Sequence, residues 1–75
     1  MDQNPNPDAL YWESTYAIVL DLKRVYPDVN LDEVGTEQLL NWIIALPNFA
    51  DDPAFANEGI LVEILREWYE EVNAL

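Results

Sequence analysis

The sequence predicts a small all-α domain built from three helices. Three segments repeat apolar residues at the spacing of one helical face, and no segment alternates apolar and polar residues for long enough to make a strand. Prolines and capping residues stand at the ends of these segments. Hydrophobic residues make up 51% of the 75 residues, so the chain can pack one small core and has room for a single domain.

The first helix is predicted from about Glu13 onward, with Ser14 as its candidate N-cap. Pro27 ends it, because a residue before a proline disfavours the α conformation. The side expected to face the core consists of Ile18, Val19, Leu22, Val25 and Tyr26. Tyr16 and Leu20 lie one turn apart outside that side. We expect them to pack against the N-terminal segment or the next element, with contact to a partner protein as the alternative.

A single helical turn and a second helix follow. Residues 28–35 are predicted to form one turn that Asn30 caps. Thr36 is expected to cap the second helix, over residues 37–46, which Pro47 ends. The apolar side of this helix is wide, which is typical of a helix covered on more than one side. That side consists of Leu39, Leu40, Trp42, Ile43, Ile44 and Leu46.

The third helix, over residues 57–72, has the clearest pattern. Its buried side is expected to consist of Leu61, Ile64, Leu65, Trp68 and Val72. Glu63, Glu67 and Glu70 lie away from that side. Three helices with short loops are compatible with a helix-turn-helix or winged-helix arrangement. A recognition helix that presents these glutamates would, however, repel the phosphates that such folds usually bind.

The chain is predicted to consist of an N-terminal tail, residues 1–11, and one helical domain, residues 12–75. The tail is rich in Asn, Pro and Asp, a composition typical of mobile termini. Its start lacks the basic and apolar regions of a signal peptide, and the longest apolar runs are too short to cross a bilayer. We therefore expect a soluble cytoplasmic protein.

Two residue types on which much protein chemistry depends are missing. The sequence contains no Cys, which excludes disulfides, thiolate metal ligands and a cysteine nucleophile. It contains no His, the commonest general base and transition-metal ligand. Adjacent carboxylates could do acid–base work only inside a pocket that separates their roles. We therefore predict that the protein is not an enzyme and requires no cofactor.

Charge is the strongest feature of the composition. Fifteen acidic residues against three basic ones give a formal net charge of −12. Nucleic acids and anionic membranes should repel such a surface, because affinity for both depends on Lys and Arg. A basic protein surface or a metal cation should attract it. The alternative interpretation is that the acidity serves solubility alone and has no specific partner.

The stretch NFADDPAFANEGIL, residues 48–61, allows two interpretations. Asp51, Asp52 and Glu58 are hard oxygen donors of the kind that suit Ca²⁺, Mg²⁺, Mn²⁺ or iron, although EF-hand spacing is missing. The structural alternative is that these residues begin helices. Asp52 stands before a proline as an N-cap does, and Asn57 can cap the third helix with an acid in its first turn.

Several short motifs occur in a specific order along the chain. They are YPD at residues 26–28, WI at 42–43, L-x-x-F-x-D-D-P at 46–53 and NE-x-IL at 57–61. This series resembles the IscX family, which consists of small acidic accessory proteins of bacterial iron–sulphur cluster assembly. The resemblance covers residues 12–71 without a gap, and the spacing of its last two motifs is the most specific part.

The resemblance implies a modified winged-helix-like fold without a functional wing. It implies that an acidic face docks on a positively charged patch of the cysteine desulfurase IscS, as an adaptor or regulator that competes with the frataxin-like protein and ferredoxin. It also implies weak iron binding through exposed carboxylates. The acidic positions carried over for partner binding are Glu13, Asp28, Asp51, Asp52 and Glu58. The candidate weak iron ligands among them are Asp51, Asp52 and Glu58.

Other positions match the family as fold residues, and some depart from it. The aromatic positions expected to stabilise the fold are Trp12, Tyr26, Trp42, Phe49 and Trp68. The first helix carries fewer acids than the family places there, with Asp21 the only one after Glu13. Acids gather instead at Asp32, Glu33 and Glu37 and at the end of the third helix. Whether the docking face has shifted accordingly stays open.

Composition and resemblance together predict an adaptor of iron–sulphur cluster assembly that binds a cysteine desulfurase electrostatically. Two alternatives from other classes stay open. An acidic DNA-mimic protein would block a basic nucleic-acid-binding groove on another protein. A ferrous-ion carrier would bind iron through the same carboxylates.

Overall fold

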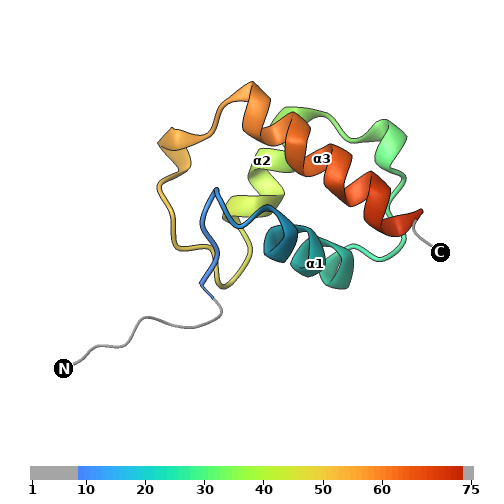
Figure 1. Ribbon diagram of the computed structural model, residues 1–75, viewed down its shortest axis with the longest axis horizontal. Coiled ribbons are helices and arrows are strands. Elements are labelled where there is room, and N and C mark those ends of the chain that lie inside the picture. The colour runs from blue at the N-terminus through green and yellow to red at the C-terminus, as the bar shows by residue number, and fades with distance from the viewer. Residues whose placement is uncertain (1–8, 74–75) are drawn as a thin grey trace.

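The computed structural model describes residues 9–73 of the chain, and helices form its framework (Figure 1). The elements are α1 (Thr15–Val25), the 3-10 turn η1 (Leu31–Glu33), α2 (Thr36–Ile44), the 3-10 turn η2 (Pro53–Phe55) and α3 (Glu58–Val72). Across residues 9–73 the β structure is limited to one isolated parallel bridge between Leu10 and Phe49. The all-α prediction with three helices is therefore confirmed, while the winged-helix arrangement stays a prediction.

Helix α3 lies across the other two helices and packs against both, more extensively against α1 (Figure 1). One apolar core fills the space between them. The side chains at its centre, which are almost completely shielded from solvent, are Ile18, Val19, Leu22, Leu39, Ile43, Ile64 and Trp68. Helical spacing predicted each of them to face the core, because the inward face of a helix is the face that carries most of its apolar residues.

Three residues expected on buried helix sides are exposed. Val25 is 42% exposed, Ile44 is 38% exposed and Val72 is 48% exposed. Each is the last residue of its helix. The apolar spacing therefore overestimated the buried face at the ends of all three helices.

The helix starts confirm three predicted side-chain caps and correct one, while Ser14 stands at the predicted cap position of α1 without a side-chain hydrogen bond. The Ile60 N–H donates to Asn57 Oδ1 at the start of α3 (2.9 Å), and Asn30 and Asp52 cap the two 3-10 turns in the same way. The expectation for Thr36 is wrong, because Gly35 occupies the cap position of α2 and Thr36 is its first residue. The Thr36 hydroxyl instead donates to Glu58 Oε1 (3.3 Å).

The five aromatic residues expected in the fold are confirmed there as two groups. Tyr26 stacks on Trp42 with ring centroids 4.2 Å apart, and Trp42 meets Trp68 edge to face at 6.3 Å. These contacts join the turn after α1 to α2 and α3. The second group pairs Trp12 with Phe49, edge to face at 4.9 Å. Such geometries suit the charge distribution of aromatic rings.

The packed body begins before residue 12, the predicted domain boundary. Leu10 is 5% exposed, its N–H donates to the Asn48 carbonyl (2.8 Å), and its carbonyl accepts from the Ala50 N–H (2.9 Å). The segment that leads into α1 is therefore fastened beside the segment that follows α2 (Figure 1). Residues 1–8 of the predicted tail lie outside the described residues.

Candidate functional site

The segment of residues 50–56, here called the aspartate loop, is fastened to Trp12. The Trp12 backbone N–H donates to Asp51 Oδ2 (2.9 Å), and the Trp12 indole N–H donates to the Asp52 carbonyl (2.8 Å). The second oxygen of Asp51 accepts from the Asp52 N–H (2.7 Å). Both oxygens of the half-buried Asp51 carboxylate are thus engaged inside the molecule. Its first role is to stabilise the loop.

Asp52 combines a structural bond with an exposed position. Its Oδ1 accepts from the Ala54 N–H (2.9 Å) and so begins η2, while the side chain faces solvent. Glu13 is exposed and follows Trp12 directly in the chain, so it lies beside the same loop. Three of the five predicted partner-binding residues, Glu13, Asp51 and Asp52, are therefore neighbours in space.

The other two predicted residues lie elsewhere. Glu58 is in the first turn of α3, where it bonds to Thr36 and so stands next to the exposed Glu37 at the start of α2. Asp28 is exposed in the turn after α1. The segment that follows α1 lies at the opposite end of the molecule from the aspartate loop (Figure 1). The five residues thus occupy three places rather than one compact face.

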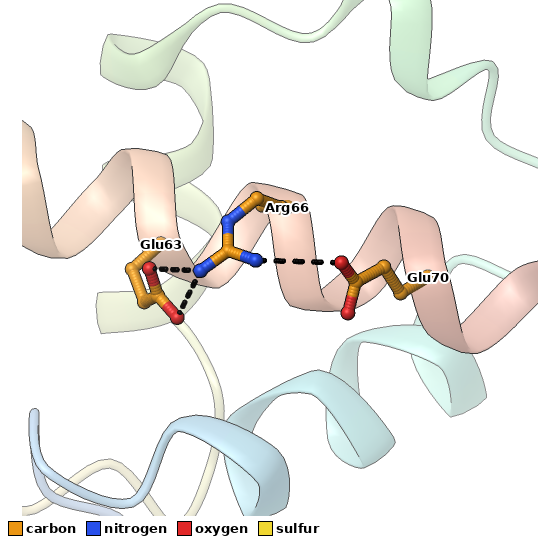
Figure 2. A network of polar contacts seen from close by, with 3 residues as sticks. All are labelled: Glu63, Arg66 and Glu70. Atoms are coloured by element: carbon orange, nitrogen blue, oxygen red, sulfur yellow. Dashed lines mark hydrogen bonds and ion pairs between the residues drawn. The ribbon is translucent and has the colours of Figure 1, made fainter.

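The outer face of α3, here meaning Glu63, Arg66 and Glu70, carries a network of ion pairs (Figure 2). The Arg66 Nη2 donates to both carboxylate oxygens of Glu63 (2.7 and 2.8 Å), and Nη1 donates to Glu70 Oε2 (3.3 Å). The hydrogen bond with Glu63, the charge of Glu63 and the charge of Glu70 raise the pKa of Arg66 above its ordinary value. Arg66 therefore offsets part of the acidity of this face.

All three basic residues of the chain are paired with carboxylates. Besides Arg66, Arg24 pairs with Asp21 one turn away on α1, and Lys23 Nζ lies 3.5 Å from Glu71 Oε2 on α3. The Lys23–Glu71 pair joins residues 48 positions apart, so no local sequence signal could have predicted it. It also relieves one of the acids that stand unfavourably at the C-terminal end of α3.

An open depression lies beside α1. Its volume is about 490 Å³, and its lining includes Leu20 and Arg24 of α1 together with Leu10 and Asn48. Tyr16 is 53% exposed and Leu20 is 42% exposed. Both residues therefore keep a large exposed surface, while Leu20 shares the depression with Ala9 and Leu10 of the N-terminal segment. Residues 1–8 lie outside the described residues, so packing within the chain stays a prediction and a partner contact stays its alternative.

The three candidate iron ligands do not converge on one point. Within residues 9–73, no group of three or more Asp and Glu side chains is arranged to hold a metal ion. Asp51 and Asp52 bond to backbone N–H groups, whereas Glu58 bonds to Thr36 on another helix. This donor set does not fit a pre-formed iron site.

The helices of the described part of the chain are also too short or too polar to span a membrane.

Comparison with known proteins points to one family. A protein-family model described as iron-sulphur cluster assembly matches residues 10–73. An uncharacterized protein of Pseudomonas aeruginosa is 33% identical over 63 residues, which cover 84% of this chain and 96% of that relative. The match begins at the buried Leu10 and spans the core, the aspartate loop and the three helices of the described residues.

Proposed function

The chain belongs to the iron–sulphur cluster assembly family, that of the IscX-like proteins, and from this premise we propose that it is an adaptor without a catalytic step of its own. In this proposal it docks acidic side chains on a basic patch of a cysteine desulfurase in the cytoplasm. The composition supports this, because a chain without Cys or His lacks the usual nucleophile and general base.

The observation that carries the proposal is the unequal pairing of charges. Each of the three basic residues forms an ion pair with an acid of its own chain. Most carboxylates of residues 9–73 stand outside these pairs, and many of those are exposed. The exposed ones outside the pairs are Glu13, Asp28, Asp32, Glu33, Glu37, Asp52 and Glu58. A surface of this kind is complementary to a cationic partner.

The proposed mechanism is electrostatic. Opposite charge speeds the encounter of the two proteins and fixes their relative orientation. Once docked, the protein occupies a basic patch that other acidic proteins, such as a frataxin-like protein or a ferredoxin, would also use. Competition for that patch would then regulate cluster formation.

Weak iron binding is a secondary part of the proposal. Because the candidate ligands do not converge, an iron ion would meet at most the adjacent Asp51 and Asp52 side chains and would complete its coordination with water. The docking mechanism does not depend on iron. A calorimetric titration with Fe²⁺ that shows no heat at millimolar metal would remove this part and leave docking intact.

The experiment that tests docking is a titration of the purified desulfurase of the same organism at increasing salt. We expect the affinity to fall steeply, because salt screens exposed charges. The double variant Glu13→Gln, Glu37→Gln should bind more weakly at low salt and differ little from the wild type at high salt. Both residues are exposed, so the variant should keep the wild-type unfolding midpoint.

Two outcomes would count against the proposal. One is affinity for the desulfurase that does not change with salt. The other is the lack of binding to the desulfurase together with binding to a basic nucleic-acid-binding protein, which would favour the DNA-mimic alternative.

A further inference from the structure

Phe55 is the most exposed large apolar residue among residues 9–73. Phe55 is 64% exposed, whereas the next most exposed large apolar residue, Tyr16, is 53% exposed. An exposed apolar residue is common on protein surfaces, so exposure alone assigns no role. What distinguishes Phe55 is its support and its surroundings.

The support of Phe55 is a tightly bonded turn. The Phe55 N–H donates to the Asp52 carbonyl (3.0 Å), and the same carbonyl accepts from the Trp12 indole N–H (2.8 Å). The Ala54 N–H is held by Asp52 Oδ1, and Trp12 itself is only 6% exposed. The turn is therefore fastened directly to the core. An aromatic side chain on such a turn has only two torsion angles to order when a partner buries it.

Along the chain, Phe55 is flanked first by small apolar residues and then by acids. Pro53 and Ala54 are exposed next to it in η2. The exposed acids closest in the chain are Asp52 and Glu58, three residues to either side. The aspartate loop contains no basic residue, since all three lie in α1 and α3 and pair with acids there. The complement of this arrangement is an apolar pocket bordered by Lys or Arg.

We propose that Phe55 is the apolar anchor of the docking surface and inserts into such a pocket on the partner. This inference rests on the proposed function, which supplies the partner: a cysteine desulfurase with a basic patch. Carboxylates around the anchor guide the encounter, while the buried ring slows dissociation. Interfaces commonly owe most of their affinity to a few buried side chains of this kind within a polar rim.

The test compares Phe55→Ala with the matched control Tyr69→Ala in titrations of the desulfurase at low and high salt. Tyr69 is an exposed aromatic residue on α3, away from the aspartate loop. Phe55→Ala should weaken binding by about tenfold or more at both salt concentrations, the loss that follows when a buried anchor is truncated. The dependence on salt should stay unchanged, because no charge is altered. Tyr69→Ala should bind like the wild type.

Phe55→Leu provides a second variant, which should recover part of the lost affinity because it restores an apolar side chain. Circular dichroism and unfolding midpoints should match the wild type for all three variants. Wild-type binding that depends on salt and is unaffected by Phe55→Ala overturns the inference and leaves the proposed function standing. Wild-type protein that does not bind the desulfurase overturns both.

Discussion

The aspartate loop and the outer face of α3 both carry acids, but they use them differently. In the loop, Asp51 accepts hydrogen bonds from the backbone N–H groups of Trp12 and Asp52, so its charge stabilises the chain path. On α3, the carboxylates of Glu63 and Glu70 bond to the exposed side chain of Arg66 (Figure 2). The comparison teaches that net charge overstates the charge available to a partner, because part of it maintains the fold.

The largest expected effect comes from Asp51→Ala, which tests the structural side of this comparison. The change removes two hydrogen bonds and leaves the Trp12 backbone N–H without its acceptor. We expect the free energy of unfolding to fall by about 2 kcal/mol, as for loss of charged hydrogen bonds to partly buried donors. Urea unfolding followed by tryptophan fluorescence measures this. In a domain of this size such a loss is a large share of the stability.

The control for Asp51→Ala is Asp28→Ala. Asp28 is exposed in the turn after α1, so this variant should unfold like the wild type. Equal unfolding midpoints for the two variants would contradict the structural role of Asp51.

An intermediate effect on stability is expected from Asn57→Ala, at the residue directly after the aspartate loop. Asn57 Oδ1 accepts from the Ile60 N–H, and the mutation removes this cap from α3. Loss of such a cap costs about 1 kcal/mol of stability. The matched control is Asn41→Ala, an exposed asparagine inside α2, where alanine is the better helix former. Stability should fall in the first variant and stay level or rise in the second, by thermal unfolding.

Local signals in the sequence were sufficient for the helices and for most of their caps. Asn57, Asn30 and Asp52 cap as predicted because a side-chain cap acts over two or three residues. The predicted cap at Thr36 was wrong because the glycine before it takes the cap position and the Thr36 hydroxyl bonds to Glu58 instead. In this case a tertiary contact decided between two local solutions.

The sequence pattern could not predict contacts between distant segments of the chain. Trp12 and Asp51 are 39 positions apart, and their hydrogen bond decides how much of the loop's charge is engaged internally. The spacing of DDP identified acids but could not show that one of them binds the backbone of the N-terminal segment. The anchor role proposed for Phe55 likewise depends on exposure, which follows from how η2 sits on Trp12.

The smallest effect on stability, and the sharpest test of the comparison, comes from Arg66→Gln on the outer face of α3. Exposed ion pairs contribute little, because solvent screens them and ordering long side chains opposes them. The variant should therefore keep the wild-type unfolding midpoint, unlike Asp51→Ala. At the same time it leaves Glu63 and Glu70 without their cation. Association with a basic partner should then become faster at low salt, by about twofold, and the gain should vanish at high salt.

Stopped-flow association kinetics with the desulfurase measure this gain, and Val62→Ala, an exposed uncharged change on α3, is the control. A variant that unfolds more easily and associates no faster would show that the α3 network maintains the fold, as the aspartate loop does. The distinction between the two regions would then be lost. Unchanged stability with faster association would show that acids on α3 can be released for a partner while Asp51 cannot, because Asp51 bonds to backbone N–H groups whereas Glu63 and Glu70 bond to the Arg66 side chain.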